Sequence, residues 1–292
     1  MKPPKGPSKS YGGSCDKSRI IIFDRLNQSM KVQDIAQLLD QLAPLEIAAD
    51  FDNTGLLVGD PEASVEKILV AHDALPEVVL EAQRLGCSLI VAFHPIIFTG
   101  LTHLTPHDYV GKAVTLAVEH KIAIFSMHTA LDQVIYGVNA PLGEALGLCE
   151  REVLAPTRIH PIHGPIGFGQ IGTLPKALSE IEFLDLVKRQ LGTPTLKHSD
   201  LTHRTIRRVA VLGGSGASGI HAAMACGADA LVTGDLKYHD YFKAEGKILL
   251  IDAGHYETEQ FTKKLIVDFL KKKIPNFAII LSDTITNPIK YY

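Results

Sequence analysis

The chain has 292 residues, of which 46% are hydrophobic and 21% are charged, and its formal net charge at pH 7 is −3. That length allows one large domain or two modest ones with real apolar cores. The near-neutral charge balance gives no basic face for nucleic acid, and no apolar run approaches the roughly 20 residues of a membrane span. We therefore expect a soluble protein. Its four scattered cysteines form no C-x-x-C pair, which predicts reduced thiols in a cytoplasmic protein.

Residues 1–29 differ from the rest of the chain and are expected to be a disordered extension. The first ten residues are rich in Lys, Pro and Ser, a composition that cannot build an apolar core. The segment also lacks the apolar stretch of a secretory signal. We expect Met30 to be the functional start of the protein.

From Met30 onward, helical and strand-like patterns alternate along the chain. The first unit has helical apolar spacing at 32–42, 77–85 and 110–120, and strand-like runs at 67–71, 88–93 and 122–127. A stretch with Pro and His at 156–165 marks the start of a second unit. That unit has strand-like runs at 167–173, 208–212, 228–233 and 247–252, and helical spacing at 181–190 and 219–226. A long amphipathic helix is expected at 257–272, and a last short strand at 278–283.

This alternation predicts an α/β fold with mostly parallel sheets and helices on their faces. The two units share the same rhythm of strands and helices. We expect one domain to consist of residues 30–150 plus 250–292, and a second α/β domain to consist of residues 151–249.

Three of the apolar runs are followed by side chains of types that can bind metal ions. The side chains that follow them are His94, then His128 and Asp132, then His255 and Glu259. In open α/β sheets the ligand crevice lies outside the carboxyl ends of the strands, so these groups can meet although they are far apart in sequence. A lone histidine is more often structural, but three strand ends with two carboxylates indicate a metal site.

Imidazole and carboxylate ligands together suit zinc, iron, manganese or nickel, and a mixed set leaves coordination positions open for water. His255 and Glu259 are four residues apart and share one face of a helix that begins near His255. Gly254 lets the backbone turn tightly before that helix. We expect one or two ions per chain.

A glycine-rich turn at 213–218 follows the strand-like run at 208–212. Its backbone N–H groups, with Gly214 and Ser215 at the centre, could cradle an anion such as a phosphate. The glycine spacing matches neither a P-loop nor the dinucleotide fingerprint. The alternative is a tight strand-to-helix connection that binds nothing.

Two further polar clusters could contact substrate or support the site. Asp235 and His239 follow the run at 228–233 and could supply acid–base groups, although Asp235 could instead cap a helix. Asp52 precedes a glycine-containing segment and marks either a turn or a polar edge of the site.

Seven short motifs stand in the order that is typical of one known family. They are 52–56 (Asp-Asn-Thr-Gly-Leu), 93–98 (Phe-His-Pro-Ile-Ile-Phe), 128–132 (His-Thr-Ala-Leu-Asp), 137–139 (Gly-Val-Asn), 213–216 (Gly-Gly-Ser-Gly), 233–239 (Thr-Gly-Asp-Leu-Lys-Tyr-His) and 254–259 (Gly-His-Tyr-Glu-Thr-Glu). Together they resemble the Nif-three-like proteins, also catalogued as GTP cyclohydrolase I type 2 homologues. The resemblance runs from Met30 to about Ser282. It covers nearly all of the chain except the extension.

The resemblance implies two similar α/β domains around a cleft with a dinuclear metal centre, assembled into a toroidal homohexamer. It carries the metal ligands over to four residues, with the last as the bridge: His94, Asp132, His255 and Glu259. Many bacterial relatives have His-His-Pro where this chain has Phe93 before His94. That change removes one nitrogen ligand, so the second metal would need His128 or a water in its place.

The function that the resemblance implies is a divalent-metal-dependent hydrolase that acts on GTP or another nucleotide or phosphate compound. Metal would activate a water molecule, and Asp132 or Glu259 could assist proton transfer. The alternative is a non-enzymatic protein, either a metal carrier or a scaffold for protein partners. An enzyme needs an open coordination position and a pocket beside His94, whereas a carrier should release its metal readily.

Overall fold

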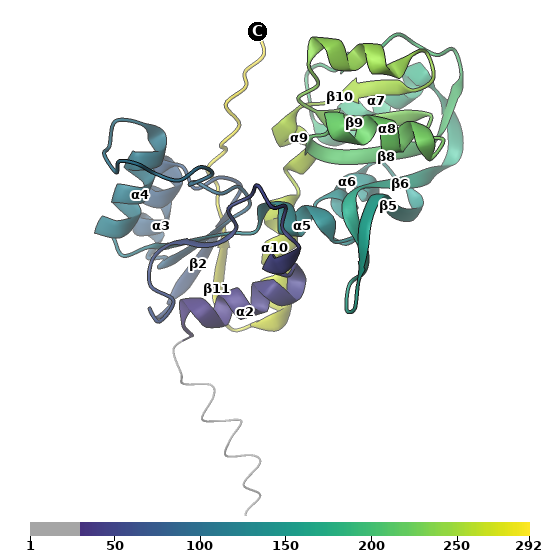
Figure 1. The fold of residues 1–292 in the computed structure, drawn as a ribbon. Coiled ribbons are helices and arrows are strands. Elements are labelled where there is room, and N and C mark those ends of the chain that lie inside the picture. The colour runs from purple at the N-terminus through teal and green to yellow at the C-terminus, as the bar shows by residue number, and fades with distance from the viewer. Residues whose placement is uncertain (1–29) are drawn as a thin grey trace, which may run out of the picture.

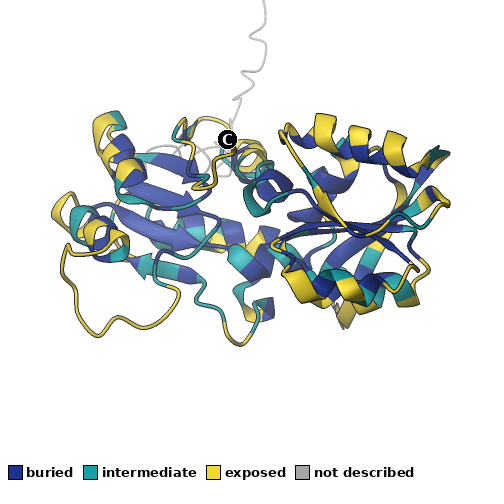
Figure 2. Ribbon diagram, turned by 90° about the horizontal axis from the view of Figure 1, so that it is seen from above, coloured by how far each residue is buried: buried dark blue, intermediate teal, exposed yellow. Residues whose placement is uncertain are grey.

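The structure is a computed structural model that describes residues 30–292 (Figure 1). The extension predicted at residues 1–29 lies outside the described residues. Two lobes stand side by side in both Figure 1 and Figure 2, and each is built on one sheet with helices against it. Within residues 30–292, no helix is both long and apolar enough to cross a membrane.

The first lobe contains a five-stranded sheet. Its strands, in spatial order, are β1 (Gly55–Val58), β4 (Ala123–Ser126), β3 (Leu89–Ala92), β2 (Lys67–Ala71) and β11 (Ala278–Leu281). All neighbours pair in parallel except β1, which runs antiparallel to β4. Every residue of β3 and β4 is buried, as expected for a parallel sheet that is covered on both faces.

Two layers of helices cover this sheet. One layer consists of α2 (Val32–Leu42) and α10 (Thr262–Lys273), and the other of α3 (Pro76–Leu85) and α4 (Tyr109–Glu119). The local sequence explains their limits. Pro76 begins α3, and Gly86 ends it with a left-handed φ of 69°. The Asp108 carboxylate accepts a hydrogen bond from the Gly111 N–H and caps α4.

The second lobe contains a six-stranded mixed sheet. Its strands, in spatial order, are β5 (Cys149–His160), β6 (Gly164–Ser179), β8 (Thr205–Ser215), β9 (Ala230–Gly234), β10 (Leu249–Asp252) and β7 (Lys197–His198). The strands β8, β9 and β10 are parallel, and the outer pairings are antiparallel. Helices α6 (Asn139–Ala145) and α7 (Glu180–Leu191) contribute to one apolar core of this lobe, and α8 (Ile220–Ala225) to the other. Figure 2 shows the strands buried between exposed helix faces. The prediction of an α/β protein with two mixed sheets is confirmed.

Several elements differ from the sequence-based expectation. The helix expected at 257–272 is divided into α9 (His255–Glu259) and α10. At the break, the Gln260 side chain donates hydrogen bonds to the carbonyls of Glu257 and Leu191. The strands β1, β5 and β7 and the short helices α5 (His128–Gln133) and α6 were not predicted. Most residues of β5 are exposed and show no apolar alternation.

The domain boundary expected between residues 249 and 250 falls inside β10, which pairs with β9 and β7 in the six-stranded sheet. The division of the chain into two domains stays a prediction.

Candidate metal centre

The candidate metal-binding side chains come from strand ends and from one short helix. His94 follows β3, and His128 begins α5 (His128–Gln133) two residues after the last residue of β4. His255 begins α9 after β10, and Glu259 ends the same helix. Figure 1 shows α9 at the junction between the two lobes. The candidate site therefore lies at the junction between the two lobes.

Three ligand atoms converge at this junction. Glu259 Oε2 lies 3.1 Å from His255 Nε2 and 3.3 Å from His94 Nε2, and the two nitrogens are 3.4 Å apart. Two ligands held at about 2.0–2.1 Å from one zinc ion at a tetrahedral angle are separated by about 3.4 Å. These three atoms therefore have the spacing that a single divalent cation requires.

The hydrogen bonding of Glu259 also fits a cation. Its Oε2 atom is buried and has no hydrogen-bond partner among the described residues, although it lies close to the imidazole nitrogens. A buried carboxylate oxygen without a donor is costly unless a positive charge satisfies it. A metal ion shared with His94 and His255 would satisfy all three atoms.

Each of three histidines is held by an aspartate through its Nδ1 atom. The pairs are Asp73 with His94 at 2.8 Å, Asp52 with His128 at 2.7 Å, and Asp235 with His255 at 2.6 Å. When Nδ1 donates to a carboxylate, Nε2 keeps its lone pair for a metal, and the ring is fixed in orientation. This arrangement is typical of metal-binding histidines.

Glycines allow the backbone to approach the site closely. Gly254, with a φ of 99°, directly precedes the first residue of α9. Gly214 has a φ of 67°, and a Cβ atom added there would clash with Glu259 Oε1. Gly214 therefore leaves room for the carboxylate that two histidines share.

Raised pKa values indicate that His94 and His255 are protonated when no metal is bound. Burial would lower the pKa of His94, but Asp73 and Glu259 outweigh this effect and raise it to about 9. Burial is likewise outweighed at His255, where Asp235 and Glu259 raise the pKa to about 10. Burial would raise the pKa of Glu259, but the imidazoles of His255, His72 and His94 beside it hold it well below its usual value. A metal would have to displace protons from both imidazoles.

Asp132 lies on α5 within electrostatic range of this cluster. Burial raises the pKa of its carboxyl well above the usual value, and the Glu259 carboxylate raises it further. Asp132 belongs to neither of the two residue groups whose ligand atoms lie within 4.8 Å of one another. Its role as a metal ligand stays a prediction.

Asp52 is an organising group beside the site. Its carboxylate accepts hydrogen bonds from the backbone N–H and the hydroxyl of Thr129 in addition to its contact with His128. Burial alone would raise the pKa of Asp52, but these bonds lower it to about 2. Asp52 therefore holds His128, whose ring centroid lies 5.3 Å from that of His94. Its place at a polar edge of the site stays a prediction.

Two backbone N–H groups of the glycine-rich turn donate hydrogen bonds to side chains of the protein itself. The N–H of Gly213 donates to Asn139 Oδ1 at 2.9 Å, and that of Gly214 donates to Thr258 Oγ1 at 3.0 Å. Ser215 is exposed and still part of β8, where it pairs with Gly234. Phosphate binding at this turn stays a prediction, and these two donors would not be available for it.

The polar cluster after β9 is split between two environments. Asp235 orients His255, whereas the residue that precedes η4 (Tyr238–Ala244) as its N-cap is Lys237, so the helix-capping alternative for Asp235 is wrong. His239 is exposed on η4, with its ring 5.1 Å from that of Tyr238.

His72 was not among the residues predicted from the sequence. This residue directly follows β2, is only 3% exposed, and has its Nε2 atom 3.4 Å from Glu259 Oε2. It obeys the same strand-end pattern that located His94, so the signal was present in the sequence. Asp73 was missed for the same reason, and it both orients His94 and accepts a hydrogen bond from Thr286.

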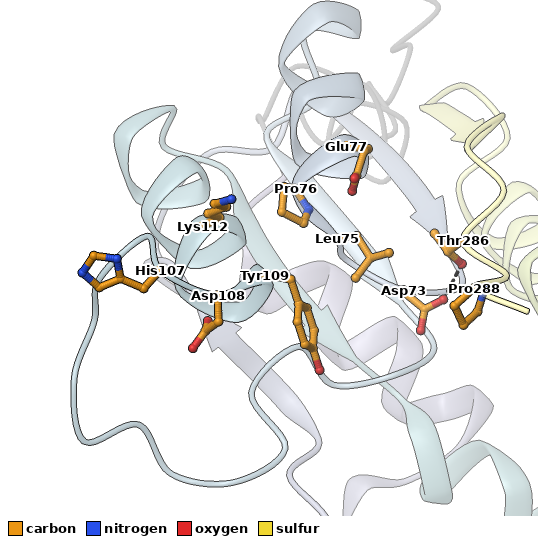
Figure 3. Close-up of a pocket in the computed structure, with 10 residues that line it drawn as sticks. All are labelled: Asp73, Leu75, Pro76, Glu77, His107, Asp108, Tyr109, Lys112, Thr286 and Pro288. Atoms are coloured by element: carbon orange, nitrogen blue, oxygen red, sulfur yellow. Dashed lines mark hydrogen bonds between the residues drawn. The ribbon is translucent and has the colours of Figure 1, made fainter.

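Two adjoining cavities open beside the cluster. The smaller has a volume of about 250 Å³ and is lined by His72, His94 and His255 and by the C-terminal segment 286–289. The larger, of about 700 Å³, shares Asp73, Thr286 and Pro288 with the smaller one. Figure 3 shows Asp73 and Thr286 joined by a hydrogen bond at one end of the larger cavity, and Lys112 and His107 at the other. A small molecule therefore has space directly beside the candidate ligands.

Comparison with known proteins identifies the family. The model of the family described as Duf34/NIF3 (NGG1p interacting factor 3) matches residues 30–288. The chain belongs to the NIF3 family. A Clostridium acetobutylicum protein named GTP cyclohydrolase 1 type 2 homolog is 33% identical over 270 residues, which cover 90% of this chain and 99% of the relative. A Clostridium perfringens protein of the same name is 30% identical, over 90% of this chain and 100% of the relative.

Solved structures agree with the family assignment. A Bacillus cereus protein related to NIF3 is similar with a TM-score of 0.85 and 25% identity, covering 91% of this chain and 100% of the other. Reduced HcgD from Methanocaldococcus jannaschii is similar with a TM-score of 0.72 and 28% identity, covering 87% and 98%. The fold of this chain is therefore shared with proteins from distant organisms.

Proposed function

We propose that this protein is a divalent-metal-dependent hydrolase whose ion is held by His94, Asp132, His255 and Glu259. The observation that carries the proposal is the convergence of two Nε2 atoms and one carboxylate oxygen at mutual distances of 3.1–3.4 Å. Zinc, iron, manganese and nickel all accept such a mixed ligand set. The adjoining cavity distinguishes the site from a closed structural metal site, which keeps no open position.

Several residues of this chain would have different roles in hydrolysis. A divalent ion bound here supplies Lewis acidity, which activates water and polarises a substrate oxygen at neutral pH. Asp73 and Asp235 fix the two histidine rings through Nδ1. Burial and Glu259 raise the pKa of the Asp132 carboxyl, so this group would have to lose its proton before it binds the ion. The 286–289 segment forms one wall of the smaller cavity.

The cavities favour a small molecule of nucleotide size as substrate. The larger, of about 700 Å³, is within the range of about 300–1,000 Å³ that is typical of small-molecule sites, and the smaller, of about 250 Å³, is just below it. The larger cavity presents Asp73, Glu77 and Asp108 against Lys112. An anionic substrate would therefore place its charge at the metal, with its neutral part in the larger cavity. The name of the clostridial relatives makes GTP the first compound to test.

The proposal is tested by measuring metal content and hydrolysis on the same purified sample. Wild type should carry tightly bound metal and hydrolyse GTP or another nucleotide, and a chelator should abolish the reaction. Glu259→Ala should lose both metal and turnover. Glu66→Ala, which changes an exposed glutamate at the start of β2, is the matched control and should retain both. Metal without turnover of any nucleotide or phosphate compound would support the carrier or scaffold alternative instead.

We also propose that the chain assembles into a homohexamer, as the resemblance implies. The hairpin of β5 and β6 projects from the second lobe (Figure 1), and near its tip Ile159 is 81% exposed and Ile162 is 83% exposed. Exposed apolar side chains on a projecting hairpin are typical of a contact surface. Light scattering should give six times the chain mass, and Ile159→Asp with Ile162→Asp should reduce it. A monomer in the wild type would refute the assembly.

A further inference from the structure

We propose that His72 is a further ligand of the metal centre, and that it binds a divalent cation through Nε2 together with Glu259 Oε2. The proposal rests on the proposed metal site and adds a residue to it. His72 would supply a nitrogen ligand beside Phe93, whose side chain has no atom that can bind a metal. The rings of His72 and Phe93 lie 5.5 Å apart.

The first observation is that His72 is buried without satisfied polar atoms. The residue is 3% exposed, and within the described part of the chain neither of its ring nitrogens has a hydrogen-bond partner. A neutral imidazole always carries one N–H and one lone pair. Buried polar groups of this kind are normally paired, so an unpaired histidine at a polar cluster needs a ligand to explain it.

The second observation is the position of the ring. His72 Nε2 lies 3.4 Å from Glu259 Oε2, about the separation that His94 has from the same oxygen. His72 also lines the smaller cavity together with His94 and His255. A cation placed between the nitrogen and the oxygen would be about 2 Å from each, which is the usual bond length for zinc and similar ions.

The third observation is that His72 and His255 belong to different groups of potential ligands. His72 forms one group with Asp73 and His94, whose ligand atoms lie within 4.8 Å of one another. His255 belongs to the other group, with His94 and Glu259. Glu259 Oε2 lies 3.4 Å from His72 Nε2 and 3.1 Å from His255 Nε2. This oxygen is therefore close enough to share a cation with either histidine.

The charge of the cluster favours this additional cation contact. Five carboxylates surround the histidines, and none of the described residues that line the smaller cavity is a lysine or an arginine. The five are Asp52, Asp73, Asp132, Asp235 and Glu259. With neutral imidazoles as ligands and Asp132 protonated, one divalent cation would leave a net charge of about −2 from the other four carboxylates. Binding at His72 reduces that excess.

The competing explanation is that His72 only donates a hydrogen bond that positions Glu259. The two roles are separated by His72→Gln, because glutamine keeps an N–H donor but is a poor ligand for zinc or cobalt. His72→Ala removes both functions. His120→Ala, which changes an exposed histidine at the end of α4, is the control.

The experiment titrates cobalt(II) into metal-free wild type and the three variants, and it follows both stoichiometry and the visible absorption spectrum. Unfolding of each metal-free protein by heat is measured first, so that only folded variants are compared. We expect His72→Ala and His72→Gln to bind fewer cobalt ions per chain, or to bind about 100-fold more weakly, which is at or above the effect of losing a supporting group. Their spectra should change, and His120→Ala should match wild type.

Two results would overturn the proposal in distinguishable ways. If wild type binds cobalt and His72→Gln matches it in stoichiometry, affinity and spectrum, His72 is not a ligand, and the site of His94, His255 and Glu259 stands. If wild type binds no cobalt, zinc or manganese, the proposed metal function fails and the role of His72 fails with it.

Discussion

The protonation of His94 and His255 makes metal binding strongly dependent on pH. Their pKa values of about 9 and about 10 mean that both imidazoles are protonated near pH 7 in the metal-free protein. A metal must displace both protons, because only the neutral ring is a ligand. Glu259 is already ionised because its pKa is lowered. We therefore expect about two protons to be released for each ion that binds.

The magnitude follows from the two pKa values. At pH 7 the competition from protons weakens binding about 100-fold at His94 and about 1,000-fold at His255. At pH 8 these factors fall to about 10-fold and about 100-fold. The apparent affinity for zinc should therefore rise about 100-fold from pH 7 to pH 8.

Calorimetric titration of the metal-free protein with zinc, in buffers with different ionisation enthalpies, counts the released protons directly. Asp235→Asn is an informative variant because its hydrogen bond is the largest contribution that raises the pKa of His255. It should release about one proton per ion. A third proton in wild type would come from Asp132, whose pKa is also raised. Affinity that does not change with pH, with no proton release, would refute the assignment of these histidines as ligands.

Two further substitutions test groups that support the site. Asp52→Asn removes the charge that His128 shares, and should lower the free energy of unfolding in urea by about 2 kcal/mol at neutral pH. Because the pKa of Asp52 is lowered to about 2, the difference from wild type should shrink as the pH falls from about 4 to about 2; an equal difference at both pH values would contradict this origin. Gly214→Ala should displace Glu259 and weaken metal binding about 10-fold or more, whereas Gly227→Ala, at a similar φ of 69° but in open space, should not. Equal effects of the two alanines on metal affinity would show that backbone strain, not the Glu259 contact, is responsible.

The strand-end rule predicted much of the site from the sequence. It selected His94, His255 and Glu259 because apolar runs of strand length are visible locally, and because parallel strands direct their carboxyl ends to one edge of a sheet. The same rule applied to β2 would have given His72, which follows that strand directly. The signal for His72 was therefore present in the sequence, but the rule was not applied to β2.

Other features depend on contacts between distant residues and leave no local pattern. The pairing of Asp235 with His255 joins residues 20 apart in sequence, and that of Asp52 with His128 joins residues 76 apart. The break between α9 and α10 involves a hydrogen bond from Gln260 to Leu191 in another helix. Helical periodicity at 257–272 continues across this break, so periodicity alone predicts one helix.

The proposed metal centre places one divalent cation between His94 Nε2, His255 Nε2 and Glu259 Oε2. Anomalous X-ray diffraction from crystals grown with zinc or manganese would locate that ion. We expect a peak about 2.0–2.3 Å from each of the three atoms, and its loss in Glu259→Ala crystals. If these atoms contact no anomalous peak, whether metal is bound elsewhere or not at all, they are not the ligands of the ion.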